Sequence, residues 1–75
     1  MFKVSVVDYA RVLFYGQAKS VVLPGKEGVF EVLDFHAPII SLLAEGDIII
    51  DGEIIPVLKG IMYFYNDELT ALVER

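Results

Sequence analysis

This sequence consists of short apolar runs separated by turn residues. Gly, Pro, Asp or Asn interrupts the runs at intervals of roughly eight to twelve residues. The runs are rich in Val, Ile, Phe and Tyr, whose side chains suit a pleated, half-buried surface. Glycines, prolines and β-branched residues leave no helical stripe of useful length. The pattern therefore predicts an all-β fold: a small antiparallel β-sandwich or flattened barrel of short strands.

The expected strands follow from these runs and from the turn residues between them. The alternation in Phe2–Val7 predicts a strand with one buried face, and Asp51-Gly52 is a strong signal for a type I′ hairpin. Asn66-Asp67 predicts a last hairpin. The expected strands are Phe2–Val7, Val12–Tyr15, Ala18–Leu23, Val29–Leu33, Ile39–Leu43, Asp47–Ile50, Glu53–Leu58, Ile61–Tyr65 and Leu69–Val73.

The segment from Pro24 to Leu43 holds the densest set of turn residues. Gly25 and Gly28 are expected to supply positive φ angles in a tight turn between two strands. Pro38 lacks a backbone donor and favours an extended residue before it, so the next strand is expected to start there.

Length and composition predict one domain, residues 1–75, in which part of the apolar surface remains exposed after the core has formed. A chain of 75 residues buries only roughly 60% of the surface that it exposes when unfolded. Hydrophobic residues nevertheless make up 56% of the sequence, and the mean hydropathy is +0.62. Because large apolar patches usually mark partner sites, the excess favours a protein that works in a complex.

Several classes of protein are excluded by the sequence. Charged residues, glycines and prolines interrupt every apolar run before the roughly 18 residues that a membrane-spanning helix needs. The start of the chain lacks the features of a signal peptide, and the absence of cysteine excludes a disulfide framework. The net charge of −5 and the scattered Lys and Arg residues argue against nucleic acid as a partner. We therefore expect a folded cytoplasmic protein.

Three strands are apolar on both sides and so do not fit a sheet with one wet face. They contain Ile48-Ile49-Ile50, Ile54-Ile55 and Ile61–Tyr65. One interpretation is that another subunit covers the outer face; the other is that exposed isoleucines merely favour the strand conformation. Neighbouring segments with the same pattern favour a contact surface, with Ile49 and Ile55 as candidate interface residues.

No catalytic, metal-binding or cofactor-binding residue stands out. His36 is the only histidine, and with Asp34 and Ser41 it has the residue types of a nucleophilic triad. The chain lacks a Gly-x-Ser-x-Gly elbow and has little length for a walled pocket, so we expect no enzyme and no cofactor. His36 is expected to be a turn residue whose ring bonds nearby backbone groups.

Nearly the whole chain resembles the N-terminal β-sandwich domain of the epsilon subunit of F-type ATP synthases. The resemblance rests on an ordered set of motifs: Phe14-Tyr15-Gly16, the glycine turn Pro24–Gly28, His36-Ala37-Pro38-Ile39, and the glycines Gly46 and Gly60 before apolar strands. Two positions depart from the family: Glu31 stands where glycine is usual, and Asp34-Phe35 replaces Pro-Gly. Because Phe35 is bulky, we expect a different loop there.

The resemblance implies a non-catalytic subunit of the central stalk of a proton- or sodium-translocating ATP synthase. It would link the gamma subunit to the ring of c subunits, peripheral to the membrane, at the cytoplasmic face of the bacterial inner membrane. The family's C-terminal helical hairpin, which can inhibit ATP hydrolysis, has no counterpart in these residues, so coupling without inhibition is expected. By position, a turn formed by Val29, Phe30 and Glu31 would lie toward the c-ring, with His36, Ser41 and Asp8 near the gamma or ring contact.

Two other functions remain open at this point. The first is a self-associating β-sandwich of unrelated role, whose apolar patch is covered by its own copy. The second is a small hydrolase that uses His36.

Overall fold

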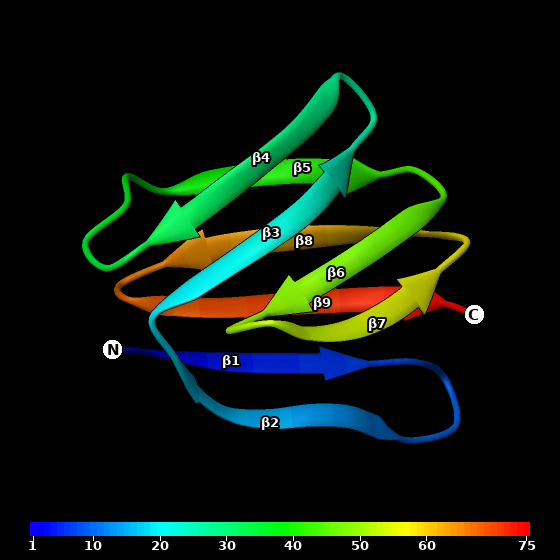
Figure 1. The fold of residues 1–75 in the computed structure, drawn as a ribbon, viewed down its shortest axis with the longest axis horizontal. Coiled ribbons are helices and arrows are strands. Elements are labelled where there is room, and N and C mark those ends of the chain that lie inside the picture. The colour runs from blue at the N-terminus through cyan, green and yellow to red at the C-terminus, as the bar shows by residue number, and fades with distance from the viewer.

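The computed structural model describes all residues 1–75, and every regular element in it is a strand (Figure 1). The prediction of an all-β fold is therefore confirmed. The nine strands are β1 (Phe2–Val7), β2 (Val12–Ala18), β3 (Ser20–Gly25), β4 (Gly28–Leu33), β5 (Ile39–Leu43), β6 (Gly46–Ile50), β7 (Glu53–Val57), β8 (Lys59–Tyr65) and β9 (Glu68–Glu74).

The strands form one continuous sheet that curls over itself into a barrel-like sandwich. Their order is β2-β1-β9-β8-β5-β3-β6-β7, with β4 on the other side of β3. All pairs are antiparallel except β1 with β9, which run parallel. A parallel pair needs a long connection, and here the whole remainder of the domain supplies it.

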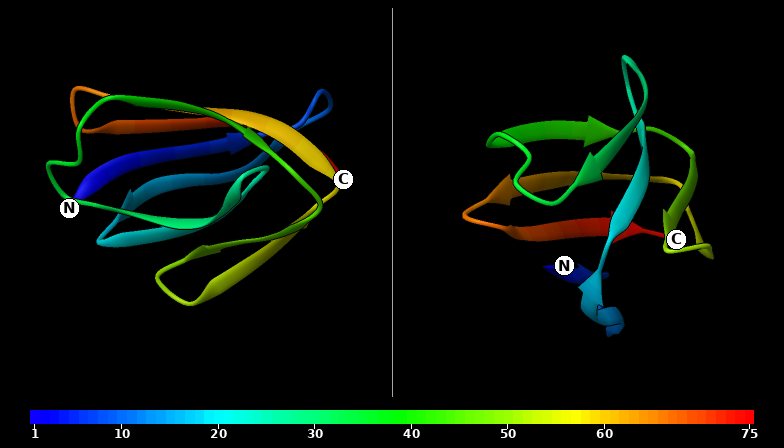
Figure 2. Two further views of the ribbon diagram at one scale, coloured as in Figure 1. Left: turned by 90° about the horizontal axis from the view of Figure 1, so that it is seen from above. Right: turned by 60° about the vertical axis from the view of Figure 1, so that its left-hand side comes forward.

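Two layers result from this curl. β2, β1, β9, β8 and β5 form one layer, and β4, β3, β6 and β7 cross it obliquely to form the other (Figures 1 and 2). The layers join where β5 meets β3 through one residue pair, Gly25 with Leu43. Each layer therefore has an inner face toward the core and an outer face toward solvent.

The core is a single cluster of 17 buried apolar residues, with no buried polar side chain. Alternate positions of each strand contribute to it, as the strand period of two requires. Phe2 and Phe64 meet edge to face within it, with ring centroids 5.5 Å apart. Burying these side chains is the main favourable term for so small a domain.

The two hairpins predicted in the C-terminal half of the chain are both present. In each, the two turn residues have a left-handed backbone conformation. Asp51 and Gly52 have φ angles of 47° and 89° between β6 and β7. Asn66 and Asp67 have φ angles of 54° and 61° between β8 and β9. Positive φ at both central residues is the requirement of a type I′ turn, whose twist matches the strands that it joins.

The turn between β3 and β4 differs from the expectation at one glycine. Gly28 has a φ of 136°, as predicted, but Gly25 does not have a positive φ. A Cβ on Gly25 would instead lie 2.7 Å from the carbonyl oxygen of Gly28 and 2.8 Å from the Phe30 ring. Gly25 is thus needed for the close approach of two strands and not for its backbone angle.

Strand bounds also depart from the expected ones. β2 continues through Gly16 to Ala18, and Gly60 lies inside β8 instead of before it. Val29, Phe30 and Glu31 form the body of β4 and not a turn. They pair in register with Pro24, Leu23 and Val22 of β3, respectively. The structure contains no helix of the length and apolar character that a bilayer crossing requires.

Candidate partner-binding surface

An unbroken row of apolar side chains crosses the outer face of the larger layer. The row begins at Leu42 of β5, which pairs with Ile61 of β8, which in turn pairs with Leu72 of β9. It continues to Val7 of β1 and ends at Val12 of β2. Residues paired directly across strands project from the same face and touch, so the row forms a continuous apolar strip.

A second row lies beside the first. Ile40 of β5 pairs with Tyr63 of β8, and both are exposed, at 75% and 45%. Met62 and Phe64, which alternate with the outward residues of β8, are buried in the core. We call the two rows together the β8 face; its residues are Val7, Val12, Ile40, Leu42, Ile61, Tyr63 and Leu72.

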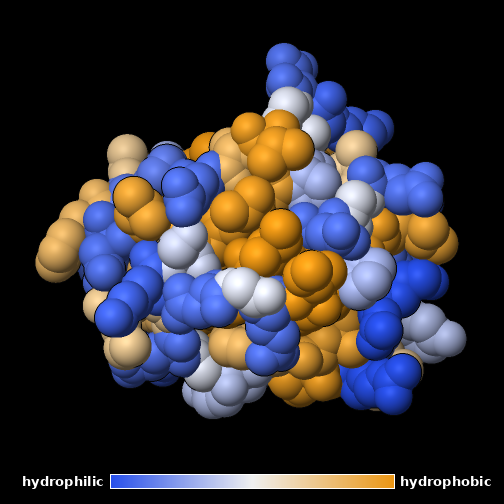
Figure 3. All heavy atoms as spheres, in the orientation of Figure 1, coloured by the Kyte–Doolittle hydropathy of each residue, from blue (hydrophilic) through white to orange (hydrophobic).

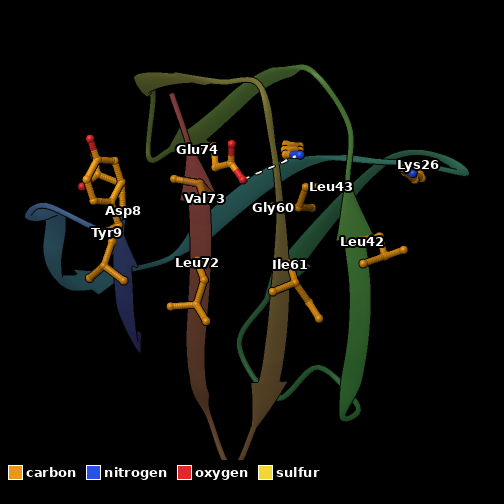
Figure 4. A pocket seen from close by; sticks show the side chains of 12 residues that line it. Asp8, Tyr9, Lys26, Leu42, Leu43, Gly60, Ile61, Leu72, Val73 and Glu74 are labelled. Atoms are coloured by element: carbon orange, nitrogen blue, oxygen red, sulfur yellow. Dashed lines mark ion pairs between the residues drawn. The ribbon is translucent and has the colours of Figure 1, made fainter.

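The β8 face is hollowed at one end, where a depression of about 640 Å³ is formed (Figure 4). Leu42, Ile61 and Leu72 project side by side from β5, β8 and β9 in this view. Charged groups stand at the rim: Lys59 Nζ lies 3.7 Å from Glu74 Oε2, and Lys26 and Asp8 also line the hollow. An apolar floor with a polar rim is the usual composition of a protein-binding surface.

Asp8, at this rim, stabilises the conformation of the β1–β2 loop to which it belongs. Its Oδ1 accepts hydrogen bonds from the backbone N–H groups of Ala10 and Arg11, at 2.7 and 2.8 Å. These two bonds favour the charged carboxylate and lower the pKa of Asp8 below its ordinary value of 3.8. The charge of Asp8 therefore has a structural role in the β1–β2 loop.

The smaller layer carries a second apolar surface. Val22 of β3 pairs with Ile49 of β6, and Ile49 pairs with Ile54 of β7. On the other side of Val22 the row ends in a charged residue, Glu31. We call Val22, Ile49 and Ile54 the β6 face. The space-filling view in Figure 3 shows a band of apolar atoms on this side of the molecule, with hydrophilic atoms on both sides of it.

Ile55 was a wrong candidate for the interface. It is 7% exposed and belongs to the core, whereas its neighbour Ile54 is 58% exposed. The register of β7 against β6 decides this, because Ile55 pairs with the buried Ile48. Ile49 is half-buried on the β6 face and stays a candidate.

The candidates on β4 do not lie together on one surface. Val29 is 73% exposed beside the β3–β4 turn, while Phe30 is half-buried and packs against the core. Glu31 faces outward and accepts a hydrogen bond from the Ser20 hydroxyl. Of the three, Val29 and Glu31 are accessible to a partner.

No hydrogen bond joins Asp34, His36 and Ser41 into a triad. His36 Nδ1 lies 2.7 Å from the carbonyl oxygen of Ala37, and the Ser41 hydroxyl donates to the carbonyl of Leu42 at 3.1 Å. Asp34 Oδ1 lies 2.8 Å from the N-terminal ammonium of Met1. The backbone contact of His36 confirms its predicted place as a turn residue. Its ring packs edge to face with that of Phe64, with the centroids 6.0 Å apart.

Comparison with known proteins identifies the family. The family model described as "ATP synthase, Delta/Epsilon chain, beta-sandwich domain" matches residues 1–75, the entire sequence. This chain belongs to that family. The resemblance inferred from the ordered motifs is therefore confirmed.

Curated relatives are ATP synthase epsilon chains from bacteria. The chain is 40% identical over 77 residues to "ATP synthase epsilon chain 2" of Nitrobacter hamburgensis, covering 97% of this chain and 57% of the relative. It is 42% identical over 77 residues to the epsilon chain of Nitratiruptor sp., covering 96% and 60%. The chain thus spans about three fifths of the length of these delta/epsilon-family relatives.

A solved structure shares the fold. In the cryo-EM structure of the central stalk and c-ring of the Tetrahymena thermophila mitochondrial ATP synthase, one chain superposes with a TM-score of 0.80. The match covers 97% of this chain and 63% of that one, at 10% identity. At this identity, the match shows that the two chains share the fold.

Most residues of the β8 face escaped the sequence-based selection of site residues. The apolar run Ile61–Tyr65 pointed to β8, but nothing in the sequence showed that Leu42 and Leu72 lie beside it. Their alignment depends on which strands are neighbours and on the register between them. Single exposed aliphatic residues in separate strands are common, so each alone carried no signal.

Proposed function

We propose that this chain is a non-catalytic rotor subunit of an F-type ATP synthase that links the gamma subunit to the c-ring for rotary coupling. The observation that carries the proposal is the β8 face, an apolar strip that crosses five strands of a domain in the delta/epsilon family. An exposed strip of this extent favours a stable partner. We assign the gamma subunit to it.

The c-ring contact is proposed for the β3–β4 hairpin. This hairpin projects from one end of the molecule (Figure 1), and Val29 beside its turn is 73% exposed. The turn residue Glu27 adds a charged group at the same end, and Glu31 lies further along β4, paired with Val22. The hairpin and the β8 face are different surfaces, so one domain can hold two partners at once.

The contacts of the candidate triad residues and the apolar core are consistent with a subunit that transmits force and catalyses no reaction. The candidate triad residues each make other contacts, and the core is a single apolar cluster without buried polar groups. Close-packed interiors have low compressibility and transmit strain. Such a domain transmits torque if its docking face is firmly held, and it takes its place at the cytoplasmic face of the bacterial inner membrane through its partners.

The test compares charge substitutions on the two outer faces. Leu72→Lys places a charge in the middle of the β8 face, and Ile54→Lys places one on the β6 face, at positions that are 48% and 58% exposed. We expect both variants to fold with similar denaturation midpoints. Leu72→Lys should lose gamma from a mild-detergent extract of native membranes, and Ile54→Lys should retain gamma and the c-ring.

Three outcomes would contradict the proposal. Recovery of neither gamma nor the c-ring with the unaltered chain would remove the rotor function. Loss of gamma only with Ile54→Lys would move the docking site to the β6 face. A tight dimer of the isolated chain at low micromolar concentration, abolished by Leu72→Lys, would favour the self-associating module instead, because the β8 face would then be covered by its own copy.

A further inference from the structure

Phe35, between β4 and β5, has a backbone conformation that side chains of its size rarely adopt. Its φ is 63°, in the left-handed region, where Cβ lies too close to the following carbonyl oxygen. The other non-glycine residues with positive φ in this chain are Asp51, Asn66 and Asp67, which belong to the residue types that tolerate it. Phe35 is the exception.

Neighbouring groups hold the loop in this shape. The N–H of Phe35 donates to Asp67 Oδ1 at 3.1 Å, and the N–H of His36 donates to the carbonyl of Leu33 at 3.2 Å. The carboxylate of Asp34 pairs with the N-terminal ammonium of Met1. Contacts on both sides of Phe35 therefore fix its backbone, which is how a strained residue persists in a folded protein.

The domain gains no packing from the strained residue. The side chain of Phe35 is 89% exposed, so it buries almost no apolar surface inside its own domain. Glycine would take the same φ without a clash. The strained backbone of Phe35 thus lowers the stability of the isolated domain, and burial of its exposed ring against a partner can offset this loss.

We propose that Phe35 is an anchor that inserts into an apolar pocket of the gamma subunit when that subunit covers the β8 face. This inference rests on the proposed function. Aromatic residues that enter a partner's pocket commonly dominate the energy of an interface. The ion pair of Asp34 with Met1 reduces the net charge beside the anchor, and the Asp67 carboxylate is held by the N–H of Phe35.

Continuity of the surface identifies the partner. A shallow hollow of about 530 Å³, formed by Pro38 and the adjoining ends of β5 and β8, lies next to the loop. It includes Ile40 and Tyr63, which belong to the β8 face, and Phe64, whose ring meets His36 of the loop. A partner that lies on the β8 face can therefore extend over this hollow to the loop that carries Phe35.

The decisive variant is Phe35→Gly, which removes the strain and the anchor together. We expect its urea denaturation midpoint to rise and its dissociation constant for purified gamma subunit to increase at least about tenfold, as for loss of a strong interface residue. Phe35→Asn, which also tolerates positive φ, should give the same pair of changes. Leu58→Ser, a loss of an exposed apolar side chain at the far end of the molecule, should leave gamma binding unchanged.

A gain in stability with a loss of binding is not expected of a merely structural residue. If Phe35→Gly folds and binds gamma within about twofold of the unaltered chain, Phe35 is not an anchor. If the denaturation midpoint falls instead, the side chain supports its own domain and the inference is wrong. If the unaltered chain fails to bind gamma at all, the proposed function fails with it, which separates the two cases.

Discussion

Ile54 and Ile55 are adjacent and chemically identical, yet one faces solvent and the other lies in the core. The period of two along β7 sends them to opposite faces of the sheet, and pairing with Ile48 puts Ile55 inside. Their sequence context, an apolar pair in an apolar strand, did not separate them. At the scale of the residue, the register decides what a side chain can do.

A lysine at each of these two positions should therefore have different effects. Ile55→Lys buries an unpaired charge and should cost several kcal/mol, on the order of the 5 kcal/mol that a marginal domain has in total. Ile54→Lys should change the free energy of unfolding by less than about 0.5 kcal/mol. Urea denaturation followed by circular dichroism measures both, and equal losses would contradict the assigned register.

Asp8 gives the stability of the domain a dependence on pH. Its pKa is lowered in the folded state by two backbone N–H bonds, so its contribution is present above its ordinary pKa and is lost as the pH falls through the lowered value. Asp8→Asn keeps an oxygen acceptor but does not titrate. Between neutral pH and about pH 2, the variant should lose less stability than the unaltered chain in urea denaturation. Identical pH profiles would show that the carboxylate has no such role.

At the scale of the element, close contact between strands restricts which residues can occupy them. A Cβ on Gly60 of β8 would lie 2.5 Å from the carbonyl oxygen of Leu72 and 2.9 Å from the Val73 side chain. Backbone of the neighbouring strand cannot move away without breaking the ladder. Gly16 of β2 is different, since its nearest contact would be an ordinary 3.6 Å to the Phe14 ring.

Alanine at these two glycines should therefore act in opposite ways. Gly60→Ala should destabilise the domain by about 1–3 kcal/mol or more, because it forces β8 and β9 apart. Gly16→Ala should be neutral or slightly stabilising, because it restricts the unfolded chain and meets no clash. Thermal unfolding of the two variants provides the comparison, and a tolerated Gly60→Ala would mean that the strands pair less closely than described.

At the scale of the whole molecule, one curled sheet produces two outer faces of unequal character. The β8 face is an uninterrupted apolar strip over five strands, whereas the β6 face is bounded by Glu31. A domain this small cannot hide all its apolar side chains, so some remain outside. Their concentration on one layer is what makes the comparison of Leu72→Lys with Ile54→Lys informative about the partner.

Much of the fold could be predicted from the sequence. Alternating and β-branched runs identified every strand, and Asp51-Gly52 and Asn66-Asp67 identified their hairpins, because these signals are local. Strand ends were less certain at Gly16 and Gly60, where a glycine continues a strand. Of the predicted interface residues, Ile55 lies in the core. Leu42 and Leu72 of the β8 face were not singled out, because nothing local places them beside β8.

From local side-chain chemistry and the order of its motifs, the sequence by itself determined the all-β class and the family. Only the tertiary structure decided that β1 pairs parallel with β9, that the apolar residues of five strands line up on one face, and that Phe35 is strained and exposed. The physical reason is that these features depend on which strands become neighbours and in which register. Such pairings join residues far apart in the chain, and no local pattern of side chains specifies them.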